Sequence, residues 1–229
     1  MKKGSGAVVT ERQDIDATLS AVDLFSGCGG MSLGFQNAGF HLLGAFDNWK
    51  PAVDVYAVNF SSPVHQRDLA DEGVVEEVAL LKPFAIIGGP PCQDFSQAGK
   101  RTEDGGRAVL TVRYGEIIAQ CMPRVVVMEN VPRVRNSIAF GQIREMLKAR
   151  GYGLTEMVLD ASRCGAPQAR KRFFMVGYLG AEDGFLDRVL IERQSKRQMT
   201  IRDYLGDSLG IDYYFRIPRS YDRHAIFSI

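Results

Sequence analysis

Short apolar runs alternate with amphipathic stretches along most of the chain, from Ala21 to Tyr178. These runs do not alternate apolar and polar residues, as strands with one solvent-exposed face do. Continuous apolar runs are typical of strands buried on both faces. We expect strands over residues 21–25, 42–46, 64–67, 84–87, 124–128, 154–159 and 172–178, and helices over residues 31–38, 51–59, 71–81, 109–120 and 138–150. This order predicts an α/β fold with a mostly parallel, doubly wound sheet and helices on both faces.

The composition is that of a folded protein. The 229 residues are 45% hydrophobic and 24% charged, and at ~150 residues per domain they make roughly one and a half domains. We expect a flexible leader over residues 1–19, a principal domain over residues 20–180 and a C-terminal extension over residues 181–229. The sequence has no run of ~18 apolar residues that would cross a membrane and no apolar core of a signal peptide, so the expected location is the cytoplasm.

Cysteine spacing and charge restrict the possible partners. Cys28, Cys92, Cys121 and Cys164 lie far apart with no CxxC, so we expect no metal site and no disulfide framework. The net charge of +1 does not by itself predict nucleic-acid binding. Residues 124–172, however, carry ten Lys or Arg against four Asp or Glu, which predicts a local basic surface.

A glycine-rich turn, DLFSGCGG over residues 23–30, follows the first predicted strand. In a doubly wound fold this position binds nucleotide-like ligands. Ser32 stands where the dinucleotide fingerprint needs its third glycine, which disfavours a nicotinamide-dependent oxidoreductase. Asp47 and Asp68 end the next two strands, where they can accept hydrogen bonds from ribose hydroxyls and an adenine amino group. Since a P-loop lysine is also absent, S-adenosylmethionine is favoured over ATP or NAD, and a purely structural turn is the alternative.

Three later motifs carry candidate catalytic residues. The strand that ends GGPPC brings the thiol of Cys92 to the cofactor crevice as a candidate nucleophile, although a lone cysteine is more often inert. Glu129 closes an apolar strand, where partial desolvation suits a carboxyl group to proton transfer, unless it is a structural acid. Arg170 and Arg172 alternate in an extended segment and can reach one polar ligand, unless they form a solvated charge run.

The glycine turn, PPCQxFS, ENV and QxRxR in this order resemble the C5-cytosine DNA methyltransferases, from about Leu19 to Tyr178. The resemblance implies a Rossmann-like, S-adenosylmethionine-dependent methyltransferase fold and double-stranded DNA as substrate. It implies that Cys92 attacks C6 of a flipped cytosine and that Glu129 holds N3 and the exocyclic amine. It further implies that Arg172 contacts O2, that Arg170 supports the site, and that S-adenosylhomocysteine is the product.

The resemblance also assigns binding residues. For the cofactor they are Phe25, Ser26, Gly27, Gly29, Gly30, Asp47, Asn48, Trp49, Asp68, Leu69, Pro91 and Leu110. For DNA they are Ser96, Lys100, Arg101 and Arg107, in or beside a glycine-rich loop over residues 97–107 that is expected to be mobile. Many relatives have tryptophan directly after the ribose-binding acid. Here Asn48 intervenes before Trp49, so either side chain is a candidate cover for the adenosine.

The sequence departs from the family pattern after Arg172. Only 57 residues follow, without the target-recognition region and closing motifs of the family. We therefore expect the catalytic subunit of a split prokaryotic or phage enzyme, whose second protein subunit supplies DNA recognition. A truncated product, a tRNA cytosine-5 methyltransferase and a non-catalytic regulatory paralogue are the alternatives. The target DNA sequence is not encoded in any motif present.

Overall fold

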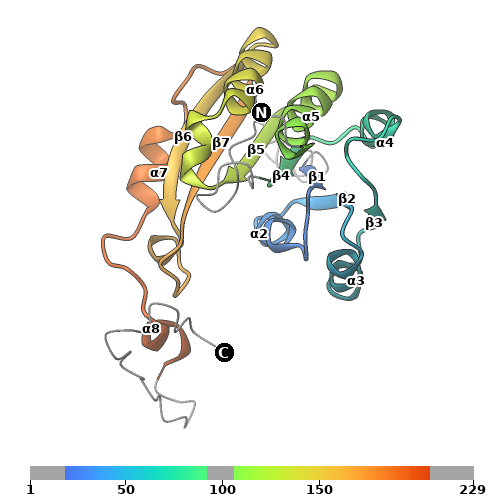
Figure 1. Cartoon of the computed structure of the whole chain (residues 1–229). Coiled ribbons are helices and arrows are strands. Elements are labelled where there is room, and N and C mark those ends of the chain that lie inside the picture. The colour runs from blue at the N-terminus through green and yellow to red at the C-terminus, as the bar shows by residue number, and fades with distance from the viewer. Residues whose placement is uncertain (1–18, 92–105, 207–229) are drawn as a thin grey trace, which may run out of the picture.

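A computed structural model describes residues 19–91 and 106–206 of the chain (Figure 1). One seven-stranded sheet has the order β3-β2-β1-β4-β5-β7-β6. Its strands are β1 (Ser20–Leu24), β2 (His41–Asp47), β3 (Val64–Gln66), β4 (Ala85–Gly88), β5 (Val125–Asn130), β6 (Tyr152–Asp160) and β7 (Lys171–Leu179). The strands from β3 to β5 in this order pair in parallel, and β7 runs antiparallel to both β5 and β6. The predicted α/β fold with a mostly parallel sheet is confirmed.

Helices cover both faces of this sheet, as Figure 1 shows. The α-helices described are α2 (Gly30–Asn37), α3 (Lys50–Asn59), α4 (Val74–Leu80), α5 (Gly106–Cys121), α6 (Ile138–Ala149), α7 (Asp187–Arg193) and α8 (Ile201–Leu205). Two 3-10 helices, η2 (Pro132–Asn136) and η3 (Ala161–Arg163), follow β5 and β6. Helices α4, α5 and α6 lie on one face of the sheet, and α2 and α3 lie on the other.

The central strands bury side chains on both faces. Ile86 of β4 belongs to the larger hydrophobic cluster, and the adjacent Ile87 belongs to a smaller cluster on the side of α2. Both side chains are fully buried. Burial on two faces requires apolar residues at consecutive positions, which is why these strands read as continuous hydrophobic runs.

Several predicted boundaries were wrong: α5 begins at Gly106, inside the loop predicted over residues 97–107, and β6 begins at Tyr152 instead of residue 154. Two further differences have a clear physical reason. Helix α4 begins at Val74 instead of near residue 71, because Gly73 precedes it with a φ of +88°, outside the helical region. Strand β5 continues through Asn130, since its ladder with β7 extends to the pair Asn130–Phe173. Glu129 therefore lies within the strand, where the sheet holds its backbone rigidly.

The strand order brings two connections to one place. The chain passes from β1 outward to β2 and β3, and then returns to β4 on the other side of β1. The carboxyl ends of β1 and β4 therefore flank a topological switch point, where α/β sheets bind their ligands. The glycine turn leaves β1 here, and the GGPPC segment leaves β4.

Hydrogen bonds tie the segments on either side of the strands to the sheet. The carbonyl of Leu19 accepts a hydrogen bond from the backbone N–H of His41 (2.8 Å). Beyond β7, the backbone N–H of Leu186 donates to Thr155 Oγ1 of β6 (3.0 Å). The predicted leader, apart from Leu19, and the part of the predicted extension after residue 206 lie outside the described residues. Across the described ranges, no helix combines the length and hydropathy that a membrane span needs.

Candidate active site

The turn after β1 has a strained backbone. Phe25, Gly27 and Gly29 have φ angles of +58°, +55° and +93°, in the left-handed region. Glycine is required at position 29, because a Cβ there would lie 2.2 Å from a ring carbon of Phe60. Phe25 lacks the conformational freedom of glycine, so its positive φ strains the backbone. Strain of this kind concentrates at ligand sites.

Asp47, the predicted ribose-binding acid, connects this turn to the end of β2. Its Oδ2 accepts a hydrogen bond from the backbone N–H of Gly27, and its Oδ1 accepts one from that of Trp49, both at 2.8 Å. These bonds fix the carboxylate, which retains acceptor capacity for a ligand hydroxyl. Asn48 and Trp49 are both exposed, Trp49 by 65%, and neither lines the cavity described below.

The other predicted cofactor residues differ in how far they are buried. Asp68 is half-buried, and its Oδ1 accepts a hydrogen bond from the backbone N–H of Ala70 (2.9 Å). Leu69 is buried in the larger hydrophobic cluster, and its carbonyl accepts a hydrogen bond from Arg113 Nε (3.2 Å). Pro91 and Leu110 are half-buried at the exit of β4 and on α5.

Glu129 and Arg172 form an ion pair across β5 and β7. Arg172 Nε lies 3.0 Å from Glu129 Oε1, and each side chain is about one quarter exposed (26% and 25%). Arg172 Nη1 also donates to the carbonyl of Lys171 (2.9 Å). Among the described residues, Arg172 Nη2 has no hydrogen-bond partner, so the guanidinium keeps donors for a ligand.

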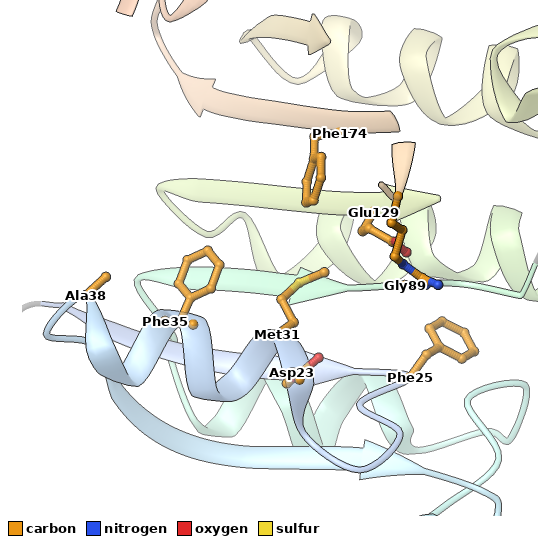
Figure 2. Close-up of a pocket in the computed structure, with 11 residues that line it drawn as sticks. Asp23, Phe25, Met31, Phe35, Ala38, Gly89, Glu129 and Phe174 are labelled. Carbon is orange, nitrogen blue, oxygen red and sulfur yellow. The ribbon is translucent and has the colours of Figure 1, made fainter. Parts of the chain in front are cut away.

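A cavity of about 590 Å³ lies between the glycine turn and Glu129, and the side chains of Asp47, Asp68 and Arg172 are not part of its lining. Figure 2 shows Phe25 and Gly89 at one end, near Glu129, and the side chains of Met31 and Phe35 of α2 opposite Phe174 of β7. The lining residues are Asp23, Phe25, Gly30, Met31, Gly34, Phe35, Ala38, Gly89, Glu129, Arg170 and Phe174. The structure therefore brings the glycine turn, the exit of β4, the ENV glutamate and the first QxRxR arginine to one cavity.

The predicted nucleophile lies outside the described residues. So do Ser96, Lys100 and Arg101, while Arg107 belongs to α5 and its side chain is not among those described. The described chain nevertheless reaches Pro91, one residue before Cys92, and Gly89 lines the cavity. Burial raises the pKa of the Cys121 thiol to about 11, so that cysteine is not a competing nucleophile.

Asn130 has a role that the sequence reasoning missed. This side chain is 3% exposed, donates from Nδ2 to the carbonyl of Pro90 (3.0 Å) and accepts from the backbone N–H of Val131 (2.8 Å). Thr111 Oγ1 donates to the next carbonyl, that of Pro91 (3.3 Å). Because prolines bring carbonyls without N–H donors, these two side chains fix the segment that leads to Cys92. The place of Asn130 in the ENV motif was the signal in the sequence that could have pointed to this role.

Two buried side-chain oxygens in the turn have no hydrogen-bond partner among the described residues. One of them belongs to Asp23, which the sequence did not predict as a site residue. They are Oδ1 of Asp23, whose side chain is 1% exposed, and Oγ of Ser26. Burial raises the pKa of Asp23 to about 7, with a smaller contribution from Asp47 and an opposing one from the hydrogen bonds of Ser32. A buried acid inside an otherwise apolar strand was the signal in the sequence.

These groups fit S-adenosylmethionine. Its ribose hydroxyls and its ammonium group are donors that suit carboxylates such as Asp47 and Asp23, and its carboxylate needs donors such as the Ser26 hydroxyl. The apolar wall around Phe25 suits the adenine ring and the sulfur. When bound, this cofactor supplies the methyl group. Within the described ranges no three metal-ligating side chains gather to hold a metal ion.

Solved structures share this architecture. A crystal structure assigned to a DNA modification methyltransferase encoded within an Escherichia coli prophage matches 82% of this chain and 54% of its own, with a TM-score of 0.69 and 28% identity. Schizosaccharomyces pombe Dnmt2 methyltransferase shares the fold, with a TM-score of 0.66 over 78% of this chain and 57% of its own. The chain thus spans about half the length of these proteins. Fold and site together define an α/β methyltransferase.

Sequence comparison gives the family. The model of the C-5 cytosine-specific DNA methylase family matches residues 19–224. Type II methyltransferase M.HgiDI of Herpetosiphon aurantiacus is 50% identical across 92% of this chain and 69% of its own length. M.HindV of Haemophilus influenzae is 48% identical across 92% and 70%. The chain belongs to the C-5 cytosine-specific DNA methylase family, which implies DNA as substrate and S-adenosylmethionine as methyl donor. The prediction from the four motifs is confirmed.

Proposed function

We propose that this chain is the catalytic part of a DNA cytosine-5 methyltransferase, with Cys92 as nucleophile and Glu129, Arg170 and Arg172 around the target base. The observation that carries the proposal is the Glu129–Arg172 ion pair, because Glu129 faces the same cavity as the glycine turn and the exit of β4. A carboxyl group and a guanidinium side by side match the N3, amine and O2 edge of cytosine.

In the proposed reaction the sulfur of Cys92 bonds to C6, and the electron pair of the C5–C6 double bond moves to C5. Glu129 provides the hydrogen bond and proton at N3 that make the ring electron-poor. C5 takes the methyl group from the sulfonium, and S-adenosylhomocysteine is released. The C5 proton then leaves to a base, the C5–C6 double bond re-forms, and the thiolate departs from C6.

The arginines have separate tasks in this scheme. Arg172 holds Glu129 through Nε and keeps the free donors of Nη2 for the carbonyl oxygen O2. Arg170 is exposed and lines the cavity, where it supports the base or the adjoining phosphate. These charges lie where negative charge develops on the ring, so they stabilise the transition state more than the ground state.

Basic side chains that follow the ENV motif support DNA as the substrate. Arg133 and Arg135 of η2 are exposed, and the guanidinium of Arg135 lies 5.7 Å from the ring centroid of Phe173. Stacking on a buried ring fixes the direction of this cation toward solvent. Exposed arginines a few residues after Glu129 are suited to phosphate contacts, which position a duplex without reading its sequence.

We also propose that a second polypeptide supplies target recognition and closes the cofactor site. The support is that apolar side chains stay partly exposed along the cavity. Phe35 of α2 and Phe174 of β7 line it and are half-buried. Co-expression with the product of the adjacent reading frame should raise methylation well above that of the chain alone. Full activity of the purified chain would exclude the second polypeptide.

The nucleophile is tested with a duplex that carries 5-fluorocytosine at the target position. Fluorine cannot leave as a proton, so the assembled enzyme should form a covalent adduct that mass spectrometry detects. Cys92→Ser should abolish the adduct, and Cys164→Ser, at an exposed cysteine, should leave it unchanged. An adduct that survives in Cys92→Ser would overturn the assignment. Methyl incorporation into tRNA but not duplex DNA would make tRNA the substrate.

A further inference from the structure

Asp23 occupies an unusual position at the edge of the cavity. It belongs to β1, is 1% exposed and lines the cavity beside Phe25 and Met31 (Figure 2). Its Oδ2 accepts a short hydrogen bond from Ser32 Oγ (2.6 Å), and its Oδ1 has no partner among the described residues. An unpaired carboxylate oxygen is costly in a buried site, so the arrangement calls for a donor from outside the fold.

A chain of hydroxyl groups leads to the paired oxygen. Tyr56 of α3 donates to Ser32 Oγ (3.0 Å), and the Tyr56 hydroxyl lies 3.2 Å from Ser62 Oγ. The Tyr56 ring is fully buried and stacks on Phe60 with centroids 4.3 Å apart, so its hydroxyl is held in place. Because Tyr56 donates to Ser32 and Ser32 donates to Asp23, each bond strengthens the next and favours the ionised carboxylate.

The surroundings of Asp23 oppose the ionisation of its carboxyl group. Burial is the largest effect, and the negative charge of Asp47 at the end of β2 adds to it. Tyr114 of α5 stays neutral, since burial and the proximity of Asp23 raise its pKa well above the usual value. Glu129 of β5 and Arg170 before β7 line the same cavity, with one negative and one positive charge. Asp23 is therefore balanced between its neutral and ionised forms near neutral pH.

We propose that Ser32 and Tyr56 are positioning residues that keep Asp23 ready for the ammonium group of the cofactor, and that cofactor binding releases a proton from Asp23. This inference rests on the proposed function, since it assumes that the cavity takes S-adenosylmethionine. The free Oδ1 accepts an N–H of the ammonium, while Oδ2 stays with Ser32.

The proton balance follows directly. In the free protein the neutral carboxylic acid is populated, and in the complex the carboxylate faces a cation, which stabilises the ionised form. The proton leaves to solvent, and the ligand keeps its own ammonium protons. Affinity for a ligand with this ammonium therefore rises with pH until Asp23 is fully ionised in the free protein.

The experiment compares two ligands that differ in this group. S-adenosylhomocysteine carries the amino-acid portion, whereas methylthioadenosine has the same nucleoside and sulfur without it. For the full chain, the affinity for S-adenosylhomocysteine should rise roughly tenfold from pH 6 to pH 8, and that for methylthioadenosine less than twofold. Calorimetry at pH 7 in two buffers of different ionisation enthalpy should show release of roughly half a proton with the first ligand only.

Conservative variants separate positioning from structure. Tyr56→Phe keeps the stacked ring, and Ser32→Ala removes the direct donor. Both should weaken S-adenosylhomocysteine binding roughly two- to fivefold at pH 7, with recovery by pH 8.5, because their carboxylate ionises at higher pH. Tyr152→Phe is the matched control, since this buried tyrosine donates instead to the carbonyl of Pro123 (2.5 Å). It should leave the pH profile unchanged.

The outcomes distinguish the two proposals. If neither the chain nor its complex with the second polypeptide binds either ligand, the cavity is not a cofactor site and the proposed function fails. If it binds both, and the affinity for S-adenosylhomocysteine is independent of pH with no proton release, the proposed function stands and the role of Asp23 is wrong. Equal losses at all pH values in Tyr56→Phe and Ser32→Ala would show a merely structural role and overturn the positioning proposal.

Discussion

Replacement of Asn130 by aspartate tests how the segment before Cys92 is held. The carboxylate keeps an acceptor for the N–H of Val131 but loses the donor to the Pro90 carbonyl, now 3.0 Å from Nδ2. One lost hydrogen bond costs roughly 0.5–1.5 kcal/mol, and an unsatisfied buried carbonyl facing a buried charge adds roughly 1–3 kcal/mol. We expect Asn130→Asp to lower the free energy of unfolding by about 2–4 kcal/mol at pH 8.

The penalty should depend on pH with a defined sign. Burial and the facing carbonyl raise the pKa of the new carboxyl group above its unfolded value, so the folded state binds the extra proton. A protonated carboxyl group can donate to Pro90 again. The destabilisation is therefore small at low pH and grows as pH rises through the folded-state pKa.

Urea denaturation of wild type and variant at pH 5 and pH 8 measures this difference. Asn136→Asp, at an exposed position of η2, is the control and should change stability by less than about 0.5 kcal/mol at either pH. Methylation should fall in Asn130→Asp but recover partly at pH 6, if the Pro90 carbonyl positions the segment. An equal penalty at both pH values, or none, would refute the reasoning.

Three further changes test other parts of the structure. Gly29→Ala should lower the free energy of unfolding by roughly 2–4 kcal/mol in urea titrations, whereas Gly30→Ala, where a Cβ meets open space, should be nearly neutral. The free energy of unfolding of Asp23→Asn, relative to wild type, should be roughly 2–3 kcal/mol higher at pH 8 than at pH 5. The reason is that the wild type loses stability as pH rises toward the Asp23 pKa of about 7. An equal difference at both pH values would contradict a buried charge. Arg135→Gln should reduce the slope of log affinity for DNA against log salt by about 1, and Arg188→Gln on α7 should not.

The strands and the location of the site were predictable because both follow from local patterns. Burial on both faces makes β4 and β5 continuously apolar, and polar motifs at strand ends mark the ligand-binding edge. Local patterns were weaker at boundaries. The start of α4 depends on the backbone conformation of Gly73, and the end of β5 depends on a partner strand more than 40 residues away.

By itself, the sequence determined the fold class, the family and the identities of the candidate catalytic residues, since these depend on residue types and their order. Only the tertiary structure showed that Glu129 pairs with Arg172, that Asp47 binds the turn at Gly27, and that an oxygen of Asp23 remains unpaired. The physical reason is that hydrogen bonds and ion pairs need atoms within about 3 Å. For residues 20 to 43 positions apart, that proximity is set by the order and direction of strands in the sheet, which no local stretch of sequence contains.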